Sequence, residues 1–462
     1  MRKSASVLSA LVLVTLFAGV QPSAGGPAQP NIVLILTDDQ RWDTLRAMPE
    51  VRRLLQDRGI TFTNGFVTNP LCCPSRASIL TGKYSHSTGV YTNNARFHGG
   101  FEAFDDSSTI ATWLDAAGYQ TALVGKYMNL YDHTTYVPPG WDRWVGMSEP
   151  TGAYYDYRVN VDGELRSYGH RNRDYSTDVI RDFAVDFIEK ADPGDPLFLY
   201  FTPYAPHGTA IPAHRHRRSF GHLHRYRPPS YNERDVSDKP AYIRKRPQFD
   251  EEKLARIAEE RRGAFQTLLA VDEAVQAIVG ALADTGRLAN TMIVFSSDNG
   301  LLWAEHRWNY KLVPYEESIR VPFIIRYDPL TAVAGKDSNL VVNIDLAPTF
   351  AELAGVAAPG VEGQSLLPLL SGPVPPWRDE FLIENLKYPR NGKGNVPTYC
   401  AIRTEDFMYA DYMNQAAELY KLEKDPFELK NVAKRPANDA IVQDLRARLA
   451  VLCIPPPPGY SL

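Results

Sequence analysis

Continuous apolar runs alternate with amphipathic stretches along most of this 462-residue chain. The stretches at 31–39, 196–207 and 291–300 begin with apolar runs and end in polar residues, a pattern typical of central strands that are buried on both faces. Stretches with helical periodicity lie between them, the longest at 250–288. Because strands alternate with helices, the pattern predicts an α/β fold with a large, mixed and mostly parallel sheet between two layers of helices.

Shorter patterns predict further elements of the same kind. Residues 49–59 have the periodicity of a helix that ends at Gly59, and residues 60–67 have the pattern of a short strand. A second helix is expected to begin at a cap formed by Ser107 or Ser108, to end at Gly118, and to lead into a strand that stops near Lys126.

The pattern changes near Gly363, where a proline-rich passage is followed by short strand-like pieces and a terminal helical stretch at 439–452. This indicates a smaller α+β unit, with a small antiparallel sheet and a helix, packed on the first. We therefore expect a main domain at 29–362 and a C-terminal subdomain at 363–462.

Composition and the N-terminus narrow the class of protein. The chain is 44% hydrophobic, a composition typical of a folded globular protein. Its formal net charge of -4 gives no sign of the excess positive charge that binding to nucleic acid requires. Arg2 and Lys3 precede an apolar run at about 5–20 and then small residues and prolines, the layout of a secretory signal peptide at 1–28. The sequence predicts a secreted or periplasmic protein without stable membrane insertion after cleavage.

The four cysteines fall into two pairs. Cys400 and Cys453 both lie in the last quarter of the chain, and in an exported protein they could form a disulfide. Cys72 and Cys73 are adjacent, a placement from which two residues cannot easily bridge to each other. A buried thiol is the interpretation that we favour for Cys73.

Polar side chains follow four predicted strands at the point where each strand ends. In parallel sheets, functional groups gather beyond the carboxyl ends of the strands, so these side chains are expected to form one site. They are Asp38, Asp39, Lys126, His207, Asp298 and Asn299.

The chemistry of this set points to a metal and an anion. Aspartate and asparagine oxygens are the ligands that a hard divalent cation such as Ca²⁺ or Mg²⁺ prefers. Cationic candidates near them would stabilise charge on the oxygens of a sulfate or phosphate group; they are Arg76, Lys126, Lys311 and His207. Cys72 fits such a site badly unless it is converted into an oxygen nucleophile, because hard cations bind thiolates poorly.

The stretch "CCPSRASILTG" at 72–82 resembles the signature of the formylglycine-dependent sulfatase family. Further motifs that resemble this family follow in order along nearly the whole chain. They are "LTDDQ", "GKY", "APH", "SSDNG", "DLAPTF" and "ELYKLEKDPFELKNVA". The resemblance implies an alkaline-phosphatase-like fold, with 29–362 as the catalytic domain, and the hydrolysis of sulfate esters.

The resemblance also implies a role for each site residue. Cys72 would be oxidised to Cα-formylglycine (3-oxoalanine) by a formylglycine-generating enzyme, and one hydroxyl of the hydrated aldehyde would attack sulfur. The second hydroxyl would then let the sulfated intermediate collapse by elimination. Lys126, Lys311 and His207 would hold the sulfate, and Arg76 would orient the diol. One Ca²⁺ would be bound by residue 72 together with Asp38, Asp39, Asp298 and Asn299.

One position departs from the family pattern. Many sulfatases have a histidine that serves as the elimination base where this chain has Met128. Either another group, such as His86 or a water, would take that role, or this subgroup differs in mechanism. For His86 we favour a structural, hydrogen-bonding role. The "GKY" form, the doubled cysteine and "YTNN" resemble the branch of N-acetylglucosamine-6-sulfatases and extracellular heparan 6-O-endosulfatases, which implies a sulfated sugar as substrate.

Two alternatives remain open from the sequence. A phosphate or phosphonate monoester hydrolase of the same superfamily would use a similar site, and a non-catalytic binder of sulfated glycans would retain the pocket with Cys72 unmodified. We expect the pocket walls to come from 86–105, 127–175 and the His/Arg-rich segment 214–230. That last segment is expected to be a solvated surface loop, with an electropositive lip for an anionic substrate as the alternative.

Overall fold

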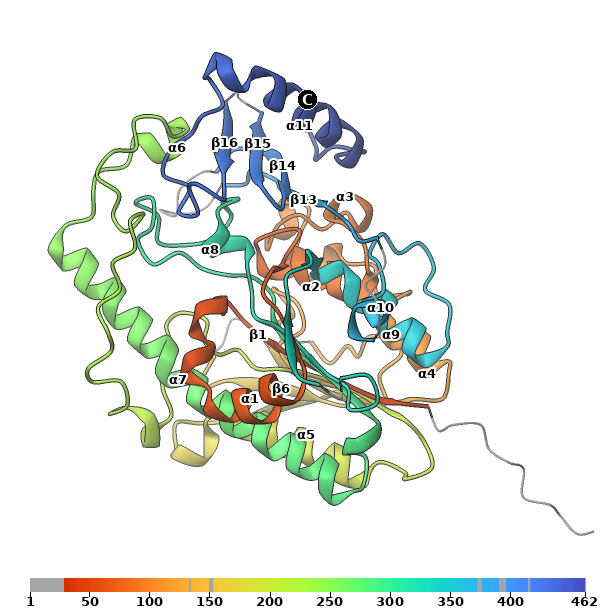
Figure 1. Cartoon of the computed structure of the whole chain (residues 1–462). Coiled ribbons are helices and arrows are strands. Elements are labelled where there is room, and N and C mark those ends of the chain that lie inside the picture. Colours follow the sequence, from red (N-terminus) through yellow and green to blue (C-terminus); the bar gives the residue numbers. More distant parts are fainter. Residues whose placement is uncertain are drawn as a thin grey trace, which may run out of the picture.

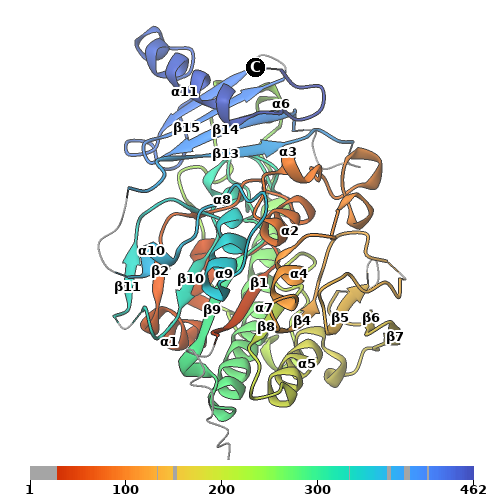
Figure 2. The same cartoon turned by 90° about the vertical axis from the view of Figure 1, so that its right-hand side faces the viewer.

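The computed structural model describes residues 29–132, 134–148, 153–331, 333–371, 376–389, 396–413 and 416–461. The predicted signal peptide at 1–28 lies outside the described residues. Within them the chain forms a large sheet between helical layers and a second, smaller sheet near the C-terminus, shown in blue at the top of Figure 2.

The large sheet has ten strands in the order β11-β2-β10-β9-β1-β8-β4-β5-β6-β7. Its central strands β9, β1, β8, β4 and β5 are parallel, whereas β10 pairs antiparallel with β9 and β6 pairs antiparallel with β5. The predicted mixed, mostly parallel sheet is thereby confirmed. In chain order its strands are β1 (Asn31–Thr37), β2 (Ile60–Phe62), β4 (Gln120–Gly125), β5 (Arg143–Ser148), β6 (Arg158–Val161), β7 (Glu164–Ser167), β8 (Leu197–Thr202), β9 (Thr291–Ser297), β10 (Phe323–Arg326) and β11 (Gly335–Asp337).

Helices cover both faces of this sheet, as the apolar runs predict (Figures 1 and 2). Alternate side chains of β1 enter two different cores: Val33 and Ile35 pack on the side of α1, α5 and α7, while Ile32 and Leu34 pack on the side of α2, α4 and α9. The helices are α1 (Pro49–Leu54), α2 (Cys72–Thr81), α3 (Ser85–Thr88), α4 (Ile110–Asp115), α5 (Ser176–Lys190), α6 (Ala241–Arg244), α7 (Glu251–Asp284), α8 (Glu316–Ile319), α9 (Leu346–Ala354), α10 (Leu367–Leu370) and α11 (Asp439–Leu452).

The longest helix, α7, is the 34-residue element expected at 250–288. It is long and apolar enough to cross a membrane by composition, but 72% of its most apolar window is buried inside the fold. Its buried residues pack in the same core as α1 and α5. This burial is typical of the core helix of a globular domain.

The C-terminal part forms a four-stranded antiparallel sheet in the order β13-β14-β15-β16, with α11 packed against it. The strands are β13 (Glu380–Asn385), β14 (Tyr399–Thr404), β15 (Phe407–Tyr412) and β16 (Ala417–Lys421). Cys400 on β14 is joined by a disulfide to Cys453 at the end of α11. The predicted small sheet, terminal helix and disulfide are all present, while the domain boundary at 362/363 stays a prediction.

Three local expectations need correction. The helix α4 is capped by Thr109, whose side chain and that of Thr112 form a capping box, and not by Ser107 or Ser108. The expected strand at 60–67 is two short strands, because β3 (Gly65–Phe66) leaves the large sheet and pairs with β12 (Val341–Val342). The expected helix at 49–59 ends at Leu54 and continues as a 3₁₀ turn before Gly59.

Candidate active site

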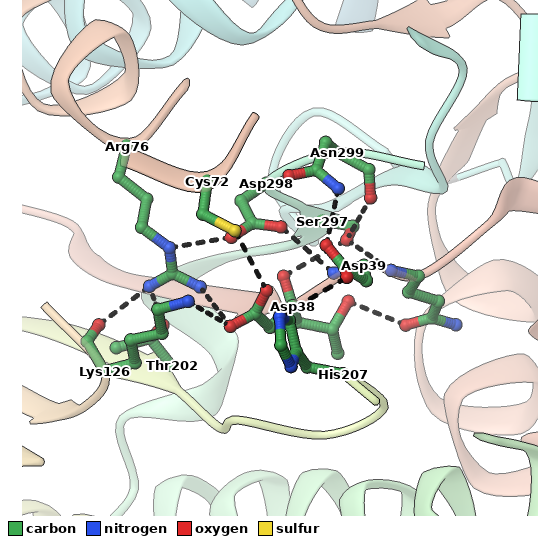
Figure 3. A network of polar contacts seen from close by, with 12 residues as sticks. Asp38, Asp39, Cys72, Arg76, Lys126, Thr202, His207, Ser297, Asp298 and Asn299 are labelled. Atoms are coloured by element: carbon green, nitrogen blue, oxygen red, sulfur yellow. Dashed lines mark hydrogen bonds and ion pairs between the residues drawn. The ribbon is translucent and has the colours of Figure 1, made fainter. Parts of the chain in front are cut away.

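Four neighbouring strands deliver the predicted polar residues to one place. The strands β9, β1, β8 and β4 are consecutive in the sheet. Three of them end directly before one of these groups, whereas His207 lies in the segment that follows the end of β8 at Thr202 and not at the strand end itself, the position predicted for it. Asp38 and Asp39 follow β1, Asp298 follows β9, and Lys126 follows β4. The side chains therefore meet at the carboxyl edge of the sheet, as Figure 3 shows.

Two backbone features bring the strand ends close together. Gly125 has φ +128°, and a Cβ on it would lie 2.0 Å from the Thr202 carbonyl oxygen, so only glycine lets β4 approach β8 here. Lys126 then donates its backbone N–H to that carbonyl at 2.8 Å. Asp39 adopts a left-handed conformation with φ 66°, and its N–H donates to Asp298 Oδ1 at 3.1 Å.

Gly300 follows Asn299 at a point where the chain after β9 comes close to α8. A Cβ on Gly300 would lie 2.2 Å from the carbonyl oxygen of Glu317. The glycine thus permits close packing of the segment after β9 against α8.

The helix α2 brings Cys72 and Arg76 over these strand ends. Cys72 is the first residue of α2 and is 1% exposed. Arg76, one turn later and fully buried, donates from Nε to Asp298 Oδ2 at 2.8 Å and from Nη1 to the Lys126 carbonyl and Thr202 Oγ1, both at 2.8 Å. Arg76 therefore braces the ends of β9, β4 and β8 against the helix.

Two buried lysines face the carboxylates and the cysteine. Lys126 Nζ lies 2.5 Å from Asp38 Oδ2. Lys311 Nζ lies 2.8 Å from Cys72 Sγ and contacts Asp39 Oδ1. The structure thus brings the cationic candidates to the same place as the carboxylates.

The charges of the site shift the pKa of its members. Burial by itself would raise the pKa of Asp38 and of Asp39, but nearby cations outweigh it, and both carboxyl groups have a pKa below the usual range. Burial raises the pKa of the Cys72 thiol to about 12, despite the opposing charges of Lys126 and Lys311. An unmodified Cys72 is consequently a neutral thiol at physiological pH, which makes it a weak nucleophile.

The donor set fits a hard divalent cation. Ligand atoms of Asp38, Asp39, Cys72 and His207 lie within 4.8 Å of one another. Asp298 and Asn299 are fully buried beside them, and the Asn299 amide nitrogen donates to Asp39 Oδ1 at 2.6 Å. Three carboxylates and an amide oxygen are ligands for Ca²⁺ or Mg²⁺ and poor ligands for a soft metal.

His207 connects this site to a cavity. Its Nδ1 lies 2.7 Å from the Gly208 carbonyl oxygen, and its Nε2 lies 3.6 Å from Asp39 Oδ2. With a side chain 25% exposed, it lines a cavity of about 670 Å³ together with Asp39, Tyr204 and Trp303. A cavity of this size can hold a sugar unit.

The cavity walls differ in part from the prediction. Asn93 and Asn129 come from the expected segments 86–105 and 127–175. Most of the remaining wall comes from two regions that the sequence analysis missed, namely Arg246 to Ala264 and Leu301 to Tyr310. Asn93 lies in the quoted motif "YTNN" and Asn129 lies just after "GKY", and these motifs were the only sequence signals for the two residues. The wall residues in the two missed regions lie in no recognisable motif.

The segment 214–230 does not line this cavity. Arg215 pairs with Asp178 on α5 and with Glu273 on α7, and His216 Nε2 lies 3.0 Å from the same Glu273. The positive charge of Arg215 is therefore neutralised by carboxylates of the helices beneath the loop. The result favours the solvated surface loop over the electropositive lip.

Met128 and His86 both lie outside the cavity. Met128 is buried in the core with its Sδ 3.7 Å from Cys73 Sγ, so Cys73 is a buried thiol, as we expected. His86 lies between two carboxylates, with Nδ1 3.1 Å from Glu384 Oε1 and Nε2 3.3 Å from Glu362 Oε1. Both ring nitrogens are engaged, which supports the structural role for His86.

A buried cysteine, an oxygen-rich set of candidate metal ligands and two lysines meet at the carboxyl edge of the ten-stranded sheet, an arrangement that suits a hydrolase acting on an ester of a tetrahedral oxyanion. Comparison with known families makes the class more specific. The sulfatase family matches residues 30–356, and the C-terminal region of N-sulphoglucosamine sulphohydrolase matches residues 304–453. The chain belongs to the sulfatase family of enzymes.

Two relatives illustrate the range of the family. The chain is 34% identical to a putative extracellular sulfatase Sulf-1 homolog of Caenorhabditis elegans, over 79% of this chain but only 53% of that protein. It is 31% identical to the N-acetylglucosamine-6-sulfatase of Homo sapiens, over 90% of this chain and 83% of that enzyme. The chain thus spans about half the length of the nematode relative and most of the human one.

Solved structures show the same fold. A structure described as a complex with its substrate D-glucosamine-2-N,6-O-disulfate has a TM-score of 0.77 and 29% identity, covering 91% of this chain and 97% of that one. The phosphonate monoester hydrolase of Agrobacterium radiobacter has a TM-score of 0.72 at 21% identity, covering 92% and 95% of the two chains. The second likeness supports the fold alone.

Proposed function

We propose that this protein removes sulfate from a sulfated sugar of the N-acetylglucosamine-6-sulfate kind, with Cys72 converted to Cα-formylglycine. The observation that carries the proposal is the placement of Cys72, buried at the start of α2 with its Sγ 2.8 Å from Lys311 Nζ and 3.6 Å from Asp38 Oδ1. Similarity to the human N-acetylglucosamine-6-sulfatase and to the glucosamine disulfate complex supports the substrate class.

One Ca²⁺ would be held by Asp38, Asp39, Asp298, Asn299 and residue 72. When bound, this ion would supply positive charge beside the reacting sulfate. Formylglycine would supply, as its hydrate, an oxygen nucleophile in place of the protonated Cys72 thiol. A hard cation binds an oxygen group at residue 72 better than a thiolate there, and the other ligands of the set also bind through oxygen.

The chain's own residues would then bind and orient the ester. The ammonium groups of Lys126 and Lys311, both fully buried, would donate hydrogen bonds to the sulfate oxygens and stabilise charge that develops on them. Arg76 would act mainly by positioning, because its hydrogen bonds hold Asp298, the Lys126 carbonyl and Thr202.

His207 would donate a proton from Nε2 to the departing alcohol oxygen. Its Nδ1 is oriented by the Gly208 carbonyl, so Nε2 is the ring atom that faces Asp39 and the cavity. Among the residues that the structure describes, His207 is the histidine that lines the cavity. This makes it the strongest candidate for proton transfer on the leaving-group side.

We also propose that the protein is exported to the periplasm or the medium and matured by a formylglycine-generating enzyme. The basic start, apolar run and small residues of 1–28 support export, and the "CCPSR" sequence supports maturation. The nematode relative is described as an extracellular sulfatase, which agrees with this localisation.

Two measurements test the proposed function. Peptide mass spectrometry of protein from its own host should find residue 72 about 18 Da lighter than cysteine, the difference between a thiol and an aldehyde. Sugar 6-sulfate should be turned over and the matched phosphonate ester should not, and Cys72→Ala should abolish turnover without unfolding the protein. An unmodified thiol at position 72 would indicate a glycan binder, and faster turnover of the phosphonate would indicate a phosphonate hydrolase.

A further inference from the structure

A second group of potential metal ligands lies away from the residues described so far. It consists of His306 in the segment after β9, Glu317 in α8, and Glu428 in the segment after β16. One possible ligand atom from each residue lies within 4.8 Å of the others. The residues are 0%, 5% and 1% exposed, so solvent does not satisfy their polar atoms.

Each of the three carries a buried polar atom without a hydrogen-bond partner. His306 Nδ1 lies 2.7 Å from Glu233 Oε2, which leaves Nε2 without a partner. Glu428 Oε2 accepts the Glu316 N–H at 3.0 Å, which leaves Oε1 without a partner, and Glu317 Oε2 also has none. Buried polar atoms without a partner are costly, at about 1–3 kcal/mol each, unless something binds them.

Three cationic side chains near this cluster pair with other groups. Arg41 pairs with Glu305, and Arg403 Nε lies 2.8 Å from Glu316 Oε1. The ammonium group of Lys239 donates to Tyr420 Oη at 2.9 Å and to the backbone carbonyl of Glu428. Within the part of the chain that the structure describes, no cation pairs directly with the side chain of Glu317 or Glu428.

The hydrogen bonding of His306 agrees with a ligand role. Its Nδ1 lies 2.7 Å from Glu233 Oε2, which leaves Nε2 as the ring atom that can bind a cation. A carboxylate behind a histidine in this way is the usual arrangement that orients a metal-bound imidazole.

We propose that His306, Glu317 and Glu428 bind a divalent cation of the Zn²⁺ class, distinct from the Ca²⁺ of the proposed active site. One imidazole nitrogen with two carboxylates suits Zn²⁺, whereas Ca²⁺ and Mg²⁺ prefer oxygen ligands alone. Glu233 is the positioning residue for the histidine. The proposal does not depend on the sulfatase activity or on the state of residue 72.

Such an ion would join three parts of the chain. The segment that carries His306 also carries Lys311, which contacts Cys72 and Asp39, and Trp303 and Trp308, which line the cavity. Glu428 belongs to the C-terminal region. The cation would thus tie the cavity wall to that region and hold Lys311 in position, in a structural rather than a catalytic role.

The test uses the full chain with Cys72→Ala, so that no thiolate at the first site can bind Zn²⁺. After incubation with Zn²⁺ and removal of the excess, elemental analysis should find one Zn²⁺ per chain, and anomalous scattering at the zinc edge should place it at His306. Thermal unfolding should shift upward with Zn²⁺. Absence of bound Zn²⁺, or its location elsewhere, would overturn the proposal.

Three variants in the same background separate this site from a nonspecific one. Glu317→Gln keeps the shape of the side chain and should lose the bound Zn²⁺ and the thermal shift. Glu233→Ala should weaken Zn²⁺ binding by about 10–100-fold. His216→Ala is the matched control, because it removes another histidine that is paired with a glutamate, and it should retain both signals. Equal binding by Glu317→Gln and the control would refute the assignment.

Discussion

The close approach of β4 to β8 at Gly125 can be tested by a single methyl group. In Gly125→Ala the new Cβ would sit 2.0 Å from the Thr202 carbonyl oxygen and 2.6 Å from its carbon, at a φ of +128°. Backbone strain costs about 1–3 kcal/mol and the steric overlap costs about 1–3 kcal/mol more. We expect the free energy of unfolding to fall by about 2–6 kcal/mol, the sum of the two contributions.

The same change should reduce activity, because it would push apart the ends of β4 and β8. Lys126 follows the first strand, and the Thr202 hydroxyl that Arg76 binds ends the second. A displacement on the order of 1 Å at a substrate-binding group can cost about 100-fold in kcat. Equilibrium unfolding in urea gives the stability, and turnover of a sugar 6-sulfate by the matured enzyme gives kcat.

Two other glycines serve as matched controls. Gly118 also has a positive φ, +84°, but a Cβ there would meet nothing within 4 Å, so Gly118→Ala should cost about 1 kcal/mol and leave kcat unchanged. Gly280 lies within α7 with open space, and Gly280→Ala should stabilise the protein by about 0.5–1 kcal/mol. If Gly125→Ala unfolds like Gly118→Ala and keeps full kcat, the close-approach argument is wrong.

Two further predictions concern stability. Burial favours the neutral form of His86, but Glu362 and Glu384 outweigh it and raise the pKa of His86 to about 9. The contribution of charged His86 to the free energy of unfolding is therefore complete below about pH 6.5 and is lost as the pH rises towards 9. Partial exposure of His86, and the raised pKa of buried Glu384, limit this contribution to about 1–2 kcal/mol. In urea unfolding the wild type should be more stable than His86→Gln at about pH 6 but not at about pH 9.5. A stability difference that stays constant with pH would contradict this prediction. Replacing both Cys400 and Cys453 by alanine opens a loop with a sequence separation of 53 and should cost about 4 kcal/mol by loop-closure entropy, measured by urea unfolding; unchanged stability would refute this.

Regular periodicity made part of the fold predictable. The helical pattern at 439–452 coincides with α11, and the stretch predicted as a strand at 31–39 contains β1. Capping was harder, because Ser107, Ser108 and Thr109 are all good caps by residue type. The choice of Thr109 depends on the hydroxyl of Thr112, which lies three residues later and completes the capping box.

The sequence alone determined the ingredients of the site: polar residues at the ends of apolar strands, and a cysteine in a sulfatase-like motif. Tertiary structure decided that the four strand ends are neighbours, because the order β9-β1-β8-β4 follows from packing and not from chain order. It also decided the cavity walls and the His306, Glu317 and Glu428 cluster, which gather residues from segments far apart in the chain. Local periodicity carries no information about such contacts, since they form only when the layers pack together.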